Sequence, residues 1–127
     1  MDLKCQHISF NVSDIEAMKN FYVNTLGMEL LDDKPNFFAA RAGDVRFSFF
    51  GGANKRNNFD DNEVGTGFVL RTDNIQKVRD ELVSKNVKML NDIVTAPGFM
   101  KFITIEDPDN NIIHIGEYLA DPLEKKI

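Results

Sequence analysis

The chain has little of what marks several common protein classes. It holds one cysteine, Cys5, which cannot form an internal disulfide and favours a reducing compartment. No apolar run approaches the length of a membrane span, and residues 1–4 lead into a strand pattern without a signal-peptide core. We therefore expect a cytoplasmic protein without a membrane partner. Lys and Arg number 15 against 20 Asp and Glu, so no basic footprint predicts nucleic-acid binding.

What is present is typical of a globular domain. The 127 residues are 43% hydrophobic and 28% charged, with only four prolines. Residues 3–12 alternate between an apolar set and a second set that contains Cys5, His7, Ser9 and Asn11. This period of two predicts a strand with His7 on the face opposite to the core.

A helix and three strands follow in the first half. Ser13 and Glu16 have capping-box spacing, which predicts a helix that Gly27 ends, and its apolar stripe is Ile15, Met18, Tyr22 and Leu26. Strands are predicted at 28–32, 37–41 and 45–50, separated by turns at Pro35-Asn36 and Gly43-Asp44.

The same order of elements then returns. A strand pattern covers 67–72, a second capping-box-like start lies at 73–76, and a helical stripe runs through Ile75, Val78 and Leu82. Further strands are predicted at 87–91, 100–106 and 111–118. A shift of 60 residues places the second cap and helix on the first, as it places Ile75 on Ile15. We therefore expect an internal repeat, because neither unit alone can bury its sheet face.

The predicted fold class is α+β. Two tandem β-α-β-β-β modules, at 1–52 and 67–120, would form curled mixed sheets around a shared concavity with the helices outside. Residues 53–66 are polar and aperiodic and would form a linker, and residues 121–127 a tail.

The most informative stretch is the turn at 106–111 and the strand after it. Its Asp, Pro and Asn residues favour a tight turn, and Asn tolerates positive φ. In the strand, His114 shares a face with Ile112 and Gly116, whereas Ile113 and Ile115 point to the core.

This arrangement resembles the vicinal oxygen chelate superfamily, which includes glyoxalase I, extradiol dioxygenases and bleomycin-resistance binding proteins. The features that carry the resemblance are His7 in the first strand, Phe21-Tyr22 before Leu26-Gly27-Met28, and the acidic Asp-Pro-Asp turn at 107–109. The resemblance implies a metal held by four strand residues, which map to His7, Phe47, Gly67 and His114. Phe49 replaces Phe47 if the register differs by two residues.

Only two of these four positions can coordinate a metal. Two imidazoles do not complete a catalytic zinc or iron site, and the nearest carboxylates are Glu106 and Glu117. His7 and His114 therefore either hold a divalent Zn, Ni, Fe or Mn ion with further ligands, or line a pocket without metal.

Other candidate ligand-binding residues follow from strand parity. Arg71 should share the face of Gly67, where it could clamp a carboxylate or pair with an acidic neighbour. Asn11 shares the face of His7, and Phe47 and Phe49 would form either aromatic pocket walls or core. Cys5 could be a soft ligand, a nucleophile or a small buried apolar residue.

We expect a small-molecule binding protein of the bleomycin-resistance type, with its ligand in an aromatic-walled concavity. The alternative is a metal-dependent lyase or dioxygenase of the glyoxalase kind that uses His7 and His114, and a third is an assembly domain with an inert pocket. The resemblance also implies a homodimer.

Overall fold

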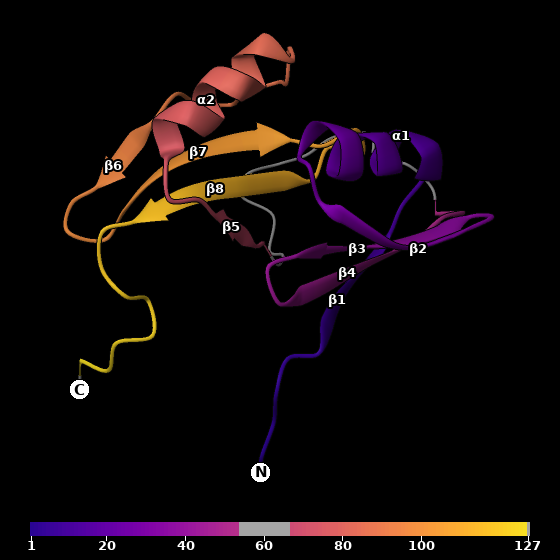
Figure 1. Ribbon diagram of the computed structural model, residues 1–127, viewed down its shortest axis with the longest axis horizontal. Coiled ribbons are helices and arrows are strands. Elements are labelled where there is room, and N and C mark those ends of the chain that lie inside the picture. Colours follow the sequence, from indigo (N-terminus) through magenta and orange to yellow (C-terminus); the bar gives the residue numbers. More distant parts are fainter. Residues whose placement is uncertain (54–66, 127) are drawn as a thin grey trace. The chain divides into compact units, whose positions relative to one another are not determined.

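A computed structural model describes residues 1–53 and 67–126 of the chain (Figure 1). The described residues form two compact units: residues 1–53 with Pro108–Asn110, and residues 67–107 with 111–126. Most of the predicted linker lies outside the described residues. Within the described ranges, no helix has the length and apolar character needed to cross a membrane.

Each unit has one mixed four-stranded sheet, and the two sheets share a topology. The first unit contains β1 (His7–Asn11), α1 (Ile15–Lys19), η1 (Asn20–Thr25), β2 (Glu29–Lys34), β3 (Phe37–Ala42) and β4 (Val45–Phe50). The second contains β5 (Val69–Arg71), α2 (Ile75–Ser84), β6 (Val94–Ala96), β7 (Met100–Glu106) and β8 (Ile112–Tyr118). The strand orders are β1-β4-β3-β2 and β5-β8-β7-β6, and the first pair of each is parallel. The predicted α+β class and repeated element order are confirmed.

The two helices begin 60 residues apart, as the repeat predicts, but the first cap differs from the prediction. Asp14, not Ser13, is the N-cap of α1, and its carboxylate accepts from the Ala17 N–H at 3.1 Å. Asn74 caps α2 through the Lys77 N–H in the same way. The Ser13 N–H and hydroxyl both donate instead to the Asp109 carboxylate.

The first helix is not α-helical throughout. Asn20–Thr25 form the π-helical segment η1, which widens the turn while Phe21 and Tyr22 stay buried. Its end matches the prediction, since Gly27 has a φ of 78° and the Met28 N–H returns to the Tyr22 carbonyl at 3.0 Å.

The predicted strand at 87–91 is wrong. Only Met89 makes an isolated bridge there, to Ile105, and the edge strand is β6, a few residues later. The turn before β8 behaves as expected. Asp107 accepts from the backbone and side-chain amides of Asn111, both at 2.9 Å, and Asn110 has a φ of 64°.

The two units have chemically different cores on their helix-covered faces. In the first, Phe49 stacks between Phe10 and Phe38, with ring centroids 4.9 and 4.3 Å apart, and Tyr22 of η1 lies at 4.7 Å. In the second, α2 lies along β7 and β8 (Figure 1), where the packing is aliphatic. Its fully or nearly buried side chains are Ile75, Leu82, Ile103, Ile105, Ile113 and Ile115. Each helix thus covers one face of its own sheet.

Candidate functional site

The face of the first sheet that its helix does not cover carries His7. Strand register aligns His7 with Arg46 and Arg41, and aligns Asn11 with Phe50 and Phe37. Both His7 and Asn11 are exposed. We call this side the first open face; it consists of His7, Ser9, Asn11, Glu29, Asp32, Lys34, Phe37, Ala39, Arg41, Arg46, Ser48 and Phe50.

The structure corrects the placement of Phe47 and Phe49. Both are buried, and they pair with Ile8 and Phe10 of β1, whose side chains point to the helix-covered core. They therefore lie on the opposite side of the sheet from His7 and do not form a wall beside it. Arg46 and Ser48 alternate with these two phenylalanines along β4, but Phe50 makes the other face of the strand apolar as well.

The corresponding face of the second sheet carries His114 and Arg71. Register aligns His114 with Val69 and Thr104, and aligns Arg71 with Gly116 and through it with Phe102. This second open face consists of Val69, Arg71, Val94, Ala96, Met100, Phe102, Thr104, Glu106, Ile112, His114, Gly116 and Tyr118. His114 and Arg71 therefore lie on the same face of the sheet, as strand alternation predicted. They belong to neighbouring rows of paired residues across the strands.

His114 is held by a hydrogen-bond chain that begins at Asn91. The Thr104 backbone N–H donates to Asn91 Oδ1 at 3.0 Å, which fixes the orientation of the amide. Asn91 Nδ2 then donates to Thr104 Oγ1 at 3.2 Å, and Oγ1 lies 2.9 Å from His114 Nδ1. The Thr104 oxygen keeps one lone pair and its hydrogen, so it meets Nδ1 as an acceptor in one tautomer of the ring and as a donor in the other. In both tautomers this bond engages Nδ1, and Nε2 is the ring nitrogen left to meet a ligand.

Aromatic and flexible apolar side chains surround this imidazole. Phe102 meets the ring of His114 edge-on, with centroids 5.9 Å apart at 82°. Further along the same face, Tyr118 contacts Phe99 edge-on at 5.6 Å, and the side chain of Met100 covers Gly116. Aromatic side chains thus lie along this face of the second unit, and they are residues other than Phe47 and Phe49. Only the pairing of β7 with β8 shows it, because neither strand alone identifies its cross-strand neighbours.

Two other sequence candidates have ordinary surroundings. The Arg71 guanidinium lies 3.0 Å from Asp73 in an ion pair whose side chains are 71% and 89% exposed. This is the salt bridge to an acidic neighbour considered from the sequence, and such exposed pairs contribute little to stability. Cys5 lies before β1 and is exposed, so the prediction of a buried apolar role for it is wrong.

The residues present do not fit the divalent metal that the resemblance implies. Beside His7, β4 offers the cationic Arg46 and Ser48, and the exposed Gly67 offers no donor. Glu106 is engaged by Lys88 at 2.7 Å, and Glu117 accepts from the Ile75 N–H at 3.1 Å on the helix side. In the described part of the chain, no three His, Cys, Asp or Glu side chains gather into a possible metal site.

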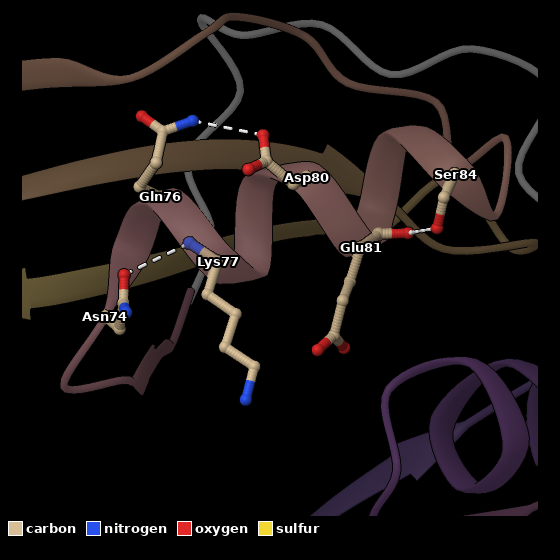
Figure 2. Close-up of a pocket in the computed structure, with 6 residues that line it drawn as sticks. All are labelled: Asn74, Gln76, Lys77, Asp80, Glu81 and Ser84. Atoms are coloured by element: carbon tan, nitrogen blue, oxygen red, sulfur yellow. Dashed lines mark hydrogen bonds between the residues drawn. The ribbon is translucent and has the colours of Figure 1, made fainter.

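A hollow of about 570 Å³ lies along the solvent side of α2 and is lined by residues of that helix and its N-cap (Figure 2). Its polar lining is occupied with helix contacts: Gln76 donates to Asp80 at 3.0 Å, and the Ser84 hydroxyl donates to the Glu81 carbonyl at 2.7 Å. Lys77 and Glu81 extend from the helix without converging on a common point (Figure 2). We read this hollow as a solvated helix surface.

The clear pKa shifts also belong to surface ion pairs. Two hydrogen bonds from the Arg79 guanidinium, at 3.1 and 3.0 Å, lower the pKa of the Asp92 carboxyl and raise that of Arg79. A hydrogen bond to Asp33 raises the pKa of Lys19. These shifts reflect stabilisation of both charged forms by the partner, and none involves an open face.

Comparisons with known proteins agree with this fold. The family model of the Glyoxalase/Bleomycin resistance protein/Dioxygenase superfamily matches residues 4–115. A glyoxalase/bleomycin resistance protein/dioxygenase from Alicyclobacillus acidocaldarius superposes with a TM-score of 0.77 at 14% identity, over 96% of each chain. A virulence protein from Salmonella typhimurium gives 0.73 at 23% identity, over 93% of this chain and 98% of that one. A lactoylglutathione lyase from Agrobacterium tumefaciens gives 0.72 at 18% identity, over 90% and 92%. A comparison with curated proteins finds no match.

Proposed function

Because the chain belongs to the glyoxalase/bleomycin resistance protein/dioxygenase superfamily, we propose that it binds a small molecule on the second open face without a metal ion. The observation that carries this proposal is the chain from Asn91 through Thr104 to His114. It holds the imidazole in one orientation and leaves Nε2 as the ring nitrogen that meets the ligand.

The surroundings of Nε2 indicate what such a ligand would contain. In the tautomer in which the Thr104 hydroxyl donates to Nδ1, Nε2 carries a hydrogen, and a carbonyl or carboxylate oxygen would accept from it. Phe102 offers a ring face or edge to a flat apolar group beside that oxygen. His114 is half-buried, so a hydrogen bond there competes less with water than one at a fully exposed site.

The second sequence-based candidate, a metal-dependent lyase or dioxygenase, gains no support from the described donors. A facial metal site needs two histidines and a carboxylate, or a third nitrogen or sulfur ligand. Lys88 pairs with the Glu106 carboxylate, and the Glu117 carboxylate accepts from the backbone N–H of Ile75 at the start of α2. We therefore place no reaction on either open face.

The proposal is tested by ligand binding in metal-free protein. A thermal-shift screen of aromatic carbonyl and carboxylate compounds would supply ligands, whose affinity is then measured by calorimetry in the presence of a chelator. His114→Ala should abolish binding. Thr104→Val, which keeps the shape but removes the hydroxyl, should weaken binding about fivefold to tenfold, the usual worth of one hydrogen bond.

Thr95→Val is the matched control, because Thr95 is an exposed threonine on the edge strand β6. Its affinity should equal that of the unmodified protein. Elemental analysis of protein purified without a metal-affinity tag decides against the proposal if it finds near-stoichiometric Zn, Ni, Fe or Mn that His114→Ala removes. Equal affinities for Thr104→Val and Thr95→Val would also contradict it.

A further inference from the structure

Asn91, the residue that begins the hydrogen-bond chain to His114, lies in a bend of the backbone and not in a strand. The bend follows the isolated bridge at Met89 and ends before β6. The amide of Asn91 is bound twice to Thr104, through Oδ1 and through Nδ2. Because its own backbone is irregular, the position of this amide depends on how the residues on either side of it are held.

Both neighbouring residues are bound, each to a different element. The Leu90 N–H donates to the Thr104 carbonyl at 2.8 Å, which ties one side of the bend to β7. Asp92 is bound to α2, since its two carboxylate oxygens accept from Nε and Nη2 of Arg79 at 3.1 and 3.0 Å. Asp92 Oδ1 also accepts from the Ile93 N–H at 2.8 Å, so this carboxylate is fixed relative to its own backbone.

The Arg79 guanidinium is oriented through three nitrogens. The two bonds to Asp92 form a bidentate pair, which specifies direction as well as charge. Nη1 donates to Asp80 Oδ1 at 3.3 Å, and the same oxygen accepts from Gln76 (Figure 2). The Arg79 side chain is 33% exposed, so it is packed more closely than an ordinary surface arginine. Arg79 is therefore a directed tie between α2 and the bend.

The place of Asp92 in the sequence gives this tie a consequence beyond stability. Exposed ion pairs contribute little to the free energy of unfolding. Asp92 adjoins Asn91, however, and successive Cα atoms are held about 3.8 Å apart, so a shift of Asp92 carries Asn91 with it. The Asn91 Nδ2 to Thr104 Oγ1 distance is already 3.2 Å. An outward displacement of about 0.5 Å takes it beyond hydrogen-bond length.

We infer that Arg79 is a positioning residue for His114, and that α2 sets the orientation of the imidazole through Asp92, Asn91 and Thr104. Every link in this series is a hydrogen bond or a peptide bond between residues of the second unit. The inference rests on the proposed function, because it concerns regulation of the same ring. It adds that a change on the helix side of the sheet alters the ring on the other face.

Imidazole ¹⁵N spectra of the ligand-free protein test this inference. The chain has two histidines, and His7 lies in the other unit, so its signals are an internal reference. Thr104→Val defines the end point, because it removes the hydroxyl that meets Nδ1 of His114. Arg79→Gln should displace the His114 signals in the same direction by a smaller amount. Arg79→Lys keeps the charge but loses the bidentate geometry, so it should restore them only in part.

These signals come from folded protein, so a uniform loss of stability does not move them. Arg41→Gln is the matched control, since it breaks an exposed ion pair with Glu29 in the first unit and should leave His114 unchanged. Asp92→Asn breaks the same pair as Arg79→Gln from the other side and should give the same displacement, which keeps the test open if one variant does not fold.

The outcomes separate this inference from the proposed function. If Thr104→Val moves the His114 signals but Arg79→Gln and Asp92→Asn do not, the inference is overturned and the proposed function stands. If Thr104→Val leaves the signals in place, the chain does not hold the ring and both proposals fail. An equal displacement in Arg41→Gln also overturns the inference, because that variant leaves every contact of the bend intact.

Discussion

Truncation of Phe49 tests whether this ring belongs to the core or to a ligand-binding wall. Its side chain has no exposed surface and lies between Phe10 and Phe38, with Tyr22 of η1 at 4.7 Å. A ring lining an empty pocket would leave water in its place when removed. A ring enclosed on every side leaves a cavity, because its rigid aromatic neighbours close the gap only in part.

The expected loss follows from these contacts. Phe→Ala substitutions at buried sites cost about 3–5 kcal/mol, as the sum of lost apolar transfer and the cavity. Phe49 stacks closely with two rings, and each aromatic pair adds about 0.5–1.5 kcal/mol beyond its buried area. We therefore expect Phe49→Ala to lower the free energy of unfolding by about 4–5 kcal/mol, near the upper end of that range.

The assay is urea denaturation followed by far-ultraviolet circular dichroism, with Phe50→Ala as the matched control. Phe50 is the next residue on the same strand, but it points to the other face and is 45% exposed. It contacts only Phe37 among the described rings, so its truncation should cost about 1 kcal/mol. Equal losses in the two variants, or a larger loss for Phe50→Ala, would refute the placement of Phe49 in the core.

Two further predictions concern polar contacts of known geometry. Asp109→Asn should lower the free energy of unfolding by about 1–3 kcal/mol, because it removes the charge and one of the two oxygen acceptors that bind the half-buried Ser13. Ser13→Ala should cost less in the same urea assay, since its backbone bond survives; the reverse order would contradict this account. Asp92→Asn should destabilise the protein at neutral pH. The lowered pKa of Asp92 means that the ion pair with Arg79 contributes above the unfolded pKa of about 4 and is lost as pH falls below it. The difference in melting temperature between Asp92→Asn and the unmodified protein should therefore vanish in acid, and a constant difference would argue against the ion pair.

The candidate site illustrates how far strand parity alone can lead. Alternation placed His114 and Arg71 on one face, and it placed His7 and Asn11 together on the other sheet. It did not identify the partners of His114. Asn91 and Thr104 lie 13 residues apart, and ten more separate Thr104 from the histidine. The register of β7 against β8 brings Thr104 to His114, and the bonding of Met89 and Leu90 to β7 brings Asn91 to Thr104.

The error at β4 has a simple physical origin. This strand carries apolar residues on both faces, Phe47 and Phe49 on one and Phe50 on the other, so hydrophobicity does not by itself assign the covered face. Packing decides it, because the rings that meet Tyr22 of η1 lose their contact with water and Phe50 does not.

The sequence by itself determined the local elements of this protein and their repetition. Caps, turn residues and two-residue alternation act within a few residues of each other, and for that reason the two β-α-β-β-β units and the Asn110 turn could be predicted. Only the tertiary structure decided the π-helical segment, the edge strand β6 and the bond of Ser13 to Asp109. Each of these depends on residues distant in sequence that become neighbours when the chain folds. Local propensity does not predict such contacts.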